Sequence, residues 1–555
     1  MFKGHPAGLF ALGLSNMGER FGYYTVMSIF ALFMGAKFGW SDEKIIVVFG
    51  CFIGGVYGLG VFGGLVADKL GYGRTILVGI ITMAVGYALM ALAGLPAWFL
   101  FIPLGVIAIG TGLFKGNVVV ILGKLYEQEQ YKKLQDAAFN IYYMGINIGA
   151  FFAPFAATGA RNYFLERAGF TYDANLPGMA NRFLEGKLDN VPEFLKLAQA
   201  QSDSHVRSVG DLAAFSHDYL GALTNGYHAG WGIAAVSVVV SMFVFLASRR
   251  YYKHADYRGV KKVEGVAAVE IPREQARQRV VALFLVFSVV VFFWVVFQQA
   301  GSTLTFFAKN YTQSQVGRFT NALFDLPAFL ALIGAIIGFV LLVGRGGSGT
   351  KRGVGALLLV AGGAIAAWRL LGFDAQNQIT AELFQSFNPI FVVFLTPVVV
   401  WFFARLEKRG KEPTAPKKIA YGMFVGAAAY LVMVIASYGL ASPAALKATG
   451  GVSPALVTPY WLISMYFTLT IAELLLSPMG LSLVAKVAPP KMKGLMQGFW
   501  FAFTGLGNFL AGQVGSFYAR LELWQTFLIL LVACFLAAIL MLAAARAVER
   551  AAKLV

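Results

Sequence analysis

Long apolar runs, repeated along the whole chain, restrict its fold more than any other feature of the sequence. Each holds about 20 residues, the length that an α-helix needs to cross a bilayer, and a β-barrel would instead show short alternating strands. We expect about fourteen spanning helices. They lie near residues 9–33, 44–66, 75–94, 99–122, 137–155, 229–248, 279–307, 326–344, 354–372, 387–404, 418–438, 457–485, 494–517 and 524–545.

The composition agrees with a membrane protein. Hydrophobic residues make up 58% of the chain and charged residues 13%, whereas about a quarter of a soluble domain is charged. Cys51 and Cys534 both lie within apolar runs, so the sequence predicts neither a disulfide framework nor a cysteine zinc site. The five histidines form no cluster at metal-ligand spacing, and we expect no metal and no cofactor.

The basic residues predict the orientation of the helices. An even number of spans places both termini on one side of the membrane. With that side as the cytoplasm, about 30 Lys and Arg residues are cytoplasmic and about 6 lie in the short loops opposite, as the positive-inside rule requires. The net charge of +18 therefore reflects topology, and we expect no nucleic-acid partner. The first run is too long for a cleavable signal peptide.

Two stretches are expected outside the bilayer. Residues 156–228 form a polar loop that contains "RFLEGKLDNVPEFLKLAQ" with helical spacing, and they should lie on the outer side. Residues 249–278 are charged and cytoplasmic, and we expect a linker with a short amphipathic helix.

Charged residues inside the first run, in "SNMGERFGYYTVM", need an explanation. A charge at the bilayer centre costs about 2.5–3.5 kcal/mol by insertion scales, so Glu19 and Arg20 must face protein or a wet cavity. Either they pair for packing alone or they serve a function, which is the default for ionisable residues inside a membrane. The polar side of this helix consists of Asn16, Glu19, Tyr23 and Met27, with Arg20 and Tyr24 on the adjoining stripe.

A lysine and a glutamate stand inside two further runs, one in each half of the chain. Lys115 lies among glycines in "GTGLFKGNV", which allow close backbone approach, and it needs an anion nearby. Glu473 lies in "AELLLSPMG", with Ser477 one turn later. We expect Lys115 and Glu473 to form either a gate that opens and closes or a static structural bridge.

Other polar residues in the spans are weaker signals. A tyrosine or asparagine inside a spanning helix, such as Tyr57 or Asn147, more often contacts a neighbouring helix than a ligand. The helices contain no nucleophile–base constellation and no phosphate loop, so an enzyme is not expected. A cavity lined by Arg, Lys, Glu and tyrosines suits a transporter of small charged or zwitterionic solutes.

Several motifs resemble one family in their order along the chain. "GERFGYY" resembles the ExxERFxYY signature of the proton-dependent oligopeptide transporter (POT/PTR) family, a branch of the major facilitator superfamily. "GGLVADKLGYGRT" is similar to the superfamily's loop between helices two and three. Further blocks are "GTGLFKGNV", "YYMGINIGAFFAP", "NGYHAGWGIAAV", "FQQAGSTLTFF", "FQSFNPIF" and "AELLLSPMGLSLVAKVAPPKMKGLMQG".

The resemblance implies a major facilitator fold, in which two six-helix bundles rock around a central site. The extra runs 326–344 and 354–372 then form an inserted hairpin beside the bundle, after the "FQQAG" block, whereas bacterial members often carry it between helices six and seven. The divisions expected are helices 1–5 in 1–155, an outer loop domain in 156–228, helix 6 in 229–248, a linker in 249–278, helix 7 and an outer loop in 279–325, the hairpin in 326–372, and helices 8–12 in 373–555.

The resemblance also implies roles for individual residues. Arg20, Lys115 and Tyr24 would surround the carboxylate of a peptide, with Tyr57 and Asn147 beside it. Glu473 would hold the peptide's amino terminus, with Asn388 and Ser477 nearby. Trp294 and Trp500 would line the pockets for peptide side chains.

Three positions depart from the family. Asn16 replaces the first glutamate of the signature. Met27 and Gln298 replace an arginine and a glutamate that form an outer salt bridge in the family, and losing both leaves no charge unpaired. Proton coupling would therefore run through Glu19, Glu473 or Asp68.

The sequence thus predicts an importer of di- and tripeptides driven by proton symport, working as a monomer in a bacterial inner membrane. Binding of a substrate carboxylate to Arg20 would release Glu19 to take up a proton. A transporter of another anionic or amphoteric solute is the first alternative, although a simple anion would have no use for Glu473. A transport-inactive receptor that holds a partner through 156–228 is the second.

Overall fold

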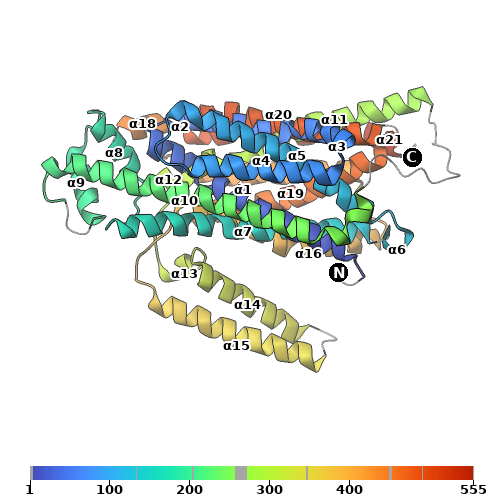
Figure 1. Ribbon diagram of the computed structural model, residues 1–555, viewed down its shortest axis with the longest axis horizontal. Helices are drawn as coiled ribbons and strands as arrows, with labels where there is room; N and C mark the ends of the chain where they lie inside the picture. The colour runs from blue at the N-terminus through green and yellow to red at the C-terminus, as the bar shows by residue number, and fades with distance from the viewer. Residues whose placement is uncertain are drawn as a thin grey trace.

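The helices of the first half surround α1, the helix that carries Glu19 and Arg20 (Figure 1). A computed structural model describes residues 4–132, 134–202, 206–256, 272–344, 348–448, 453–489 and 492–553. The helices of the first half are α1 Ala7–Phe38, α2 Asp42–Gly58, α3 Gly60–Leu70, α4 Tyr72–Ala91, η1 Ala97–Leu100, α5 Phe101–Leu125, α6 Glu129–Lys132, α7 Gln135–Arg167 and α10 Leu212–Ala247.

The second half forms another bundle, in which α17 packs between α19 and α21. The expected seventh helix, 279–307, is divided by a 3₁₀ turn at the sequence QQAG. The elements of this half are α11 Arg273–Phe297, η5 Gln298–Gly301, α12 Thr303–Tyr311, η6 Ala381–Ser386, α16 Phe387–Glu407, α17 Ala415–Ser437, α18 Pro443–Ala448, α19 Tyr460–Val487, α20 Lys493–Gly515, η8 Ser516–Ala519 and α21 Leu523–Lys553.

The fourteen expected runs all form helices, because every backbone polar group in a bilayer must be bonded within the chain. Among the described residues, 13 helices are long and apolar enough to cross a membrane. The remaining run is α20, a helix of 23 residues that packs on α2 and α11. The protein is therefore a multi-pass, all-α membrane protein. In the described part of the chain the strands are β1 Gln315–Val316 and β2 Asn377–Gln378, one antiparallel pair.

The inserted hairpin consists of α14 Leu326–Val343 and α15 Gly349–Gly372, which pack on each other and lie beside the bundle (Figure 1). Asp325 caps α14 by accepting from the Ala328 N–H at 2.9 Å. The same carboxylate binds Arg369 near the end of α15, with Oδ2 2.5 Å from Nη2. This ion pair therefore holds the start of α14 and the end of α15 together at one side of the membrane.

The loop expected at 156–228 is shorter in the structure. Here α7 continues to Arg167 and α10 begins at Leu212, so both helices extend well beyond the expected spans. The "RFLEGKLDNVPEFLKLAQ" stretch contains the end of one short helix and most of a second. The elements between α7 and α10 are α8 Leu176–Leu184, α9 Val191–Ala200 and η2 Val209–Asp211.

The loop elements α8 and α9 cover one end of the bundle, which we call the outer end; both chain termini lie at the opposite end (Figure 1). Gly39, in the left-handed conformation (φ 61°), ends α1 there. Asn181 of α8 donates to the Gly35 and Ala36 carbonyls at 3.3 and 3.0 Å, which satisfies backbone acceptors at the end of α1.

The linker expected at 249–278 is described only in part. Short 3₁₀ turns follow α10, namely η3 Arg249–Tyr251 and η4 Lys253–Ala255, and α11 begins at Arg273. Asp256 Oδ1 accepts from the Gly73 N–H at 2.8 Å and so caps the start of α4. The amphipathic helix expected within this linker lies outside the described residues.

The two halves touch along α2 and α20, where glycines bring the backbones together. A Cβ atom on Gly50 would lie 2.5 Å from the Gly512 Cα, and one on Gly505 would lie 2.7 Å from the Gly58 nitrogen. Any side chain at these positions would push the helices apart. The halves meet a second time where α7 contacts η6 and α16.

Candidate functional site

Glu19 and Arg20 of α1 bind to each other. Arg20 Nε and Nη2 lie 2.5 and 2.6 Å from the two Glu19 carboxylate oxygens, a bidentate pair. Both side chains are buried, with 0% of Glu19 and 3% of Arg20 exposed. The Arg20 guanidinium also lies 4.5 Å from the centre of the Tyr23 ring. This pairing, within protein rather than lipid, explains how the membrane-spanning helix tolerates two charges.

Lys115 of α5 lies on an aromatic ring rather than beside a carboxylate. Its Nζ atom is 3.5 Å from the centre of the Tyr57 ring, a cation–π contact between α5 and α2. Lys115 is also within electrostatic reach of Arg20 and Glu19. Two cations and one anion therefore gather in the first half, which leaves this side of the site with a net positive charge.

Glu473 of α19 supplies the negative charge in the second half. It is buried, and Asn388 Nδ2 donates to its Oε2 at 2.9 Å and to Thr470 Oγ1 at 3.0 Å. The hydroxyl of Tyr143, which comes from α7 in the first half, donates to Oε1 at 2.5 Å. Among the described residues no cation lies within ion-pair distance of Glu473, so its charge is held by neutral donors.

The two charged sides of the site face one region. Tyr24 and Tyr57 each lie within electrostatic reach of both Arg20 and Glu473. Lys115 and Glu473, however, are not joined by an ion pair anywhere in the described structure. The gate between them stays a prediction, and in this conformation each has its own partner.

The two expected tryptophans lie in different surroundings. Trp294 of α11 faces Tyr57, with ring centres 6.2 Å apart, and its buried Nε1 has no partner among the described residues. Trp500 of α20 is buried against Gly480, where a Cβ atom would lie 2.0 Å from Trp500 Cη2. Trp294 therefore stands at the tyrosine side of the site, and Trp500 packs between α20 and α19.

Asn147 of α7 is buried, and Ser477 of α19 is half-buried. Asn147 Nδ2 donates to the Tyr143 carbonyl at 2.9 Å, one turn earlier on its own helix. The Ser477 hydroxyl and the Asn16 amide nitrogen are buried without a hydrogen-bond partner in the described structure. An unsatisfied buried polar group costs about 1–3 kcal/mol, so these groups are ready to bind water or a ligand.

Two other carboxylates lie away from this cluster. Asp68, the third expected proton carrier, is exposed at the end of α3 and accepts from the Tyr72 hydroxyl at 3.0 Å. Glu382 is buried on η6, where it binds Arg161 of α7. Sequence reasoning missed Arg161 and Glu382 because it assigned the first to a loop and began the neighbouring apolar run, 387–404, after the second.

Tyr143 was also missed by sequence reasoning. It lies in "YYMGIN", one turn before Asn147, so the helical spacing that selected Asn147 points to Tyr143 as well.

No group of three or more His, Cys, Asp or Glu side chains that could hold a metal ion occurs in the described parts of the chain.

Comparisons with known proteins identify the family of this chain. A family model described as the POT family matches residues 73–271 and 371–530. Dipeptide and tripeptide permease B of Edwardsiella piscicida is 29% identical over 537 residues, which cover 93% of this chain and 87% of that protein. Peptide transporter YePEPT of Yersinia enterocolitica is 28% identical over 534 residues, with 93% and 88% covered.

Solved structures show the same fold. A peptide transporter POT in complex with sulfate has a TM-score of 0.64 at 22% identity, over 99% of this chain and 96% of that one. A POT family transporter in complex with 5-aminolevulinic acid has a TM-score of 0.65 at 17% identity, over 98% and 97%. The fold is therefore the expected major facilitator fold, with the hairpin added to it.

Proposed function

This chain belongs to the POT family, and on that premise we propose that it imports di- and tripeptides by proton symport. The relatives named above are dipeptide and tripeptide permeases and a peptide transporter. Import would proceed by alternating access, in which the two six-helix bundles rock around the site between them.

One observation carries this proposal: the opposite charges on the two halves. Arg20 and Lys115 give the first half its net positive charge, and Glu473 gives the second half a negative one. A short peptide carries a carboxylate and an ammonium at a nearly fixed separation. A site that binds these termini recognises the peptide backbone and leaves the side chains free to vary, which favours a broad range of peptides.

The roles of individual residues follow from their positions. Arg20 and Lys115 would bind the peptide carboxylate with help from Tyr24, and Tyr57 and Asn147 would lie beside it. Glu473 would bind the amino terminus in place of the Tyr143 hydroxyl, while Asn388 keeps the carboxylate in position and Ser477 adds a hydroxyl. The peptide's side chains would contact Trp294 and Trp500.

Coupling to protons is assigned to Glu19 and Glu473. In the described part of the chain Glu19 accepts hydrogen bonds from Arg20 alone, so a substrate carboxylate at Arg20 would loosen that pair and free Glu19 to take up a proton. Glu473 has neutral partners and changes its surroundings when the halves move. Lys115 and Glu473 would approach each other in another conformation and act there as a gate.

The setting proposed for this transporter is a bacterial inner membrane with both termini in the cytoplasm. The positive-inside rule supports that orientation, and both termini lie at one end of the bundle. A single chain supplies all the residues of the site, which supports a monomer as the working unit.

Uptake of labelled dialanine by proteoliposomes tests the function. With an inward proton gradient we expect accumulation above equilibrium, and without it only equilibration. Uptake that ignores the gradient would contradict proton symport and indicate a facilitator. No uptake by folded protein would contradict peptide transport and favour another solute or a receptor. N-acetylated dialanine, which lacks the ammonium, tests Glu473 without a proton gradient: its equilibration should be weak in the parent and insensitive to Glu473→Gln.

A further inference from the structure

A buried ion pair joins the two halves at the outer end. Arg161 lies near the end of α7, and its Nη1 group donates to Oε1 of Glu382 on η6, which also accepts from Thr158 Oγ1 at 3.0 Å. Neither charged side chain is exposed. Within its own half the guanidinium donates to Asn162 Oδ1 at 2.9 Å and lies 3.6 Å from the Tyr172 ring centre. Arg161 is thus fixed in one half, and its counter-charge comes from the other.

We propose that Arg161 and Glu382 form the outer gate of the transport path, an inference that rests on the transport function proposed above. The outer ends of α7 and η6 can separate only if this pair breaks. Breaking it while either charge stays buried is strongly unfavourable, because an unpaired charge in a poor solvent has no compensation. The pair therefore stabilises the conformation that is closed to the outside.

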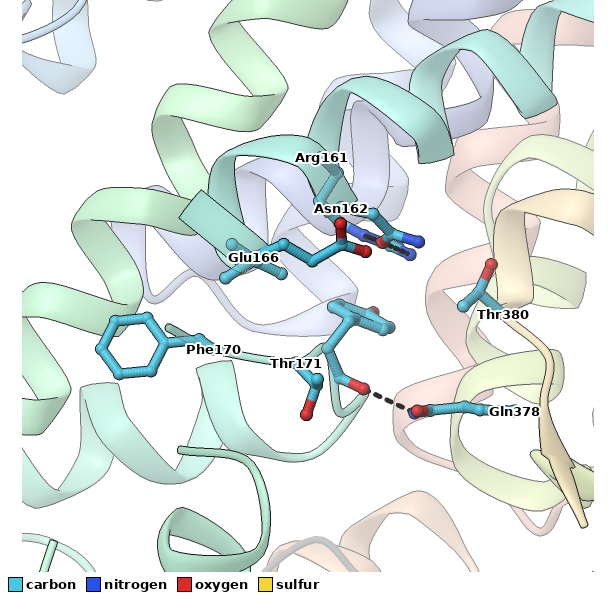
Figure 2. A pocket seen from close by; sticks show the side chains of 9 residues that line it. Arg161, Asn162, Glu166, Phe170, Thr171, Gln378 and Thr380 are labelled. Atoms are coloured by element: carbon cyan, nitrogen blue, oxygen red, sulfur yellow. Dashed lines mark hydrogen bonds between the residues drawn. The ribbon is translucent and has the colours of Figure 1, made fainter. Parts of the chain in front are cut away.

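Water has access to the place where the pair would break. Cavities of about 170 and 490 Å³ adjoin it, and both are lined by Asn162, Gln378 and Thr380. Figure 2 shows these side chains around Arg161, which lines the smaller cavity. Thr380 Oγ1 and Glu382 Oε2 are buried without a partner among the described residues. When the halves separate, the Thr380 hydroxyl and water entering the two cavities can solvate both charges, so the pair opens toward water.

At the two positions where the resemblance implies an outer salt bridge, the chain carries no charge. Met27 of α1 is buried and apolar, and Gln298 begins η5 as a neutral amide. Opposite charges that join the two halves are supplied instead by Arg161 of α7 and Glu382 of η6.

A second ion pair between the halves provides a matched control. Glu43, at the start of α2, binds Arg520, which follows η8. This pair also joins a carboxylate and a guanidinium across the two halves, but 35% of Glu43 and 64% of Arg520 are exposed. Exposed ion pairs contribute little, because water already solvates both charges. The two pairs differ mainly in burial, which is the property that the gate requires.

Labelling of a cysteine beneath the pair tests the gate. Ser386 is buried deeper between the halves, where its hydroxyl donates to the Phe151 carbonyl at 3.2 Å. In a chain carrying Cys51→Ser, Cys534→Ala and Ser386→Cys, we expect slow labelling by an impermeant maleimide added outside right-side-out vesicles.

Adding Arg161→Gln or Glu382→Gln should speed this labelling about tenfold or more, because the closed conformation loses its stabilising pair. Adding Glu43→Gln should leave the rate within about twofold of the parent. Unchanged labelling in both gate variants, or equal acceleration by Glu43→Gln, would overturn the proposal.

Folding and transport are separated in this experiment. If a single gate variant loses its monodisperse elution, R161Q/E382Q replaces it, since the double variant leaves no unpaired charge and should label as fast. Labelling does not require transport. A parent that labels as described but takes up no dialanine would contradict the proposed function and leave the gate intact.

Discussion

Tyr143 and Glu473 are joined across the two halves of the molecule, with the tyrosine hydroxyl 2.5 Å from the carboxylate oxygen Oε1. Asn388, from the same half as Glu473, holds the other oxygen at 2.9 Å. One half thus fixes this carboxylate permanently, and the other does so only while α7 and α19 stay in their present relation. A movement of the halves exchanges the Tyr143 hydroxyl for whatever else can donate to Glu473, including an ammonium group.

Tyr143→Phe should strengthen the binding of dialanine. A hydrogen bond to a charged group contributes about 1.5–3 kcal/mol, and without the hydroxyl the peptide's ammonium has no competitor for Glu473 Oε1. We expect the KM for dialanine uptake to fall about tenfold with the protein folded. Tyr163→Phe is the control, because Tyr163 lies on the same helix and is 57% exposed. An unchanged KM in Tyr143→Phe would mean that Tyr143 only fills space.

Lys115→Gln should affect peptides that have a free carboxylate. The lysine rests on the Tyr57 ring and has no carboxylate partner among the described residues, so its charge is available to a substrate anion. We expect dialanine uptake to fall about tenfold or more in kcat/KM, while the already weak uptake of dialanine amide stays the same. Lys44→Gln controls for the loss of a cation–π contact, since Lys44 Nζ lies 3.8 Å from the Trp40 ring centre near the outer end. Equal losses for both substrates would contradict the role in carboxylate binding.

Glu19→Gln should abolish accumulation above equilibrium and preserve exchange of peptide across the membrane. The amide cannot carry a proton, although it can still accept a hydrogen bond from Arg20. The substitution leaves the Arg20 charge without a counter-charge, and losing one partner of a buried pair costs about 3–5 kcal/mol, so the melting temperature should also fall. Counterflow of labelled dialanine separates the two effects, because it requires folded protein and no proton gradient. Accumulation equal to the parent's would exclude Glu19 as the proton carrier.

Asp173→Asn should change the pH dependence of stability. Burial raises the pKa of Asp173 above its ordinary 3.8, although the Asn175 and Leu176 N–H groups bind its Oδ1 and oppose the shift. Because the folded protein binds this proton more tightly than the unfolded chain, the parent loses stability as pH rises through the two pKa values. The asparagine does not ionise, so the variant's melting temperature relative to the parent should be higher at pH 7 than at pH 4.

Thermal unfolding in detergent at the two pH values measures this difference. Asp189→Asn, at an exposed position of the same outer loop, should show the same difference from the parent at both. A pH-independent effect of Asp173→Asn would contradict the prediction.

The helices and the charged residues of the site were accessible to sequence reasoning for one physical reason. In a bilayer only helices satisfy the backbone, so long apolar runs define the fold, and a charge within such a run stands out. Glu19, Arg20, Lys115 and Glu473 were found in this way. Tyr143 was not, because it carries no charge and the carboxylate it binds is 330 residues away.

Arg161 and Glu382 could not be found from the sequence, although both are charged. Polar residues end an apolar run, so hydropathy places the outer end of a long helix in a loop. Each of these residues is buried only because the other half supplies its counter-charge, 221 residues away in sequence. Burial that depends on a distant partner leaves no local pattern. The ends of α7 and α10 were set too short for the same reason, since both helices continue past the apolar segment into the outer domain.

The glycines between α2 and α20 give the motion of the halves a direction. These helices run along one edge of the bundle, and α7 and α16 run along the opposite edge (Figure 1). At the first edge, backbone meets backbone at Gly50 and Gly512. The two bundles can therefore pivot about the glycine contact, while Arg161 and Glu382 hold the halves together at the opposite edge. Most of the free energy needed to open the outer end is then the free energy of breaking this ion pair.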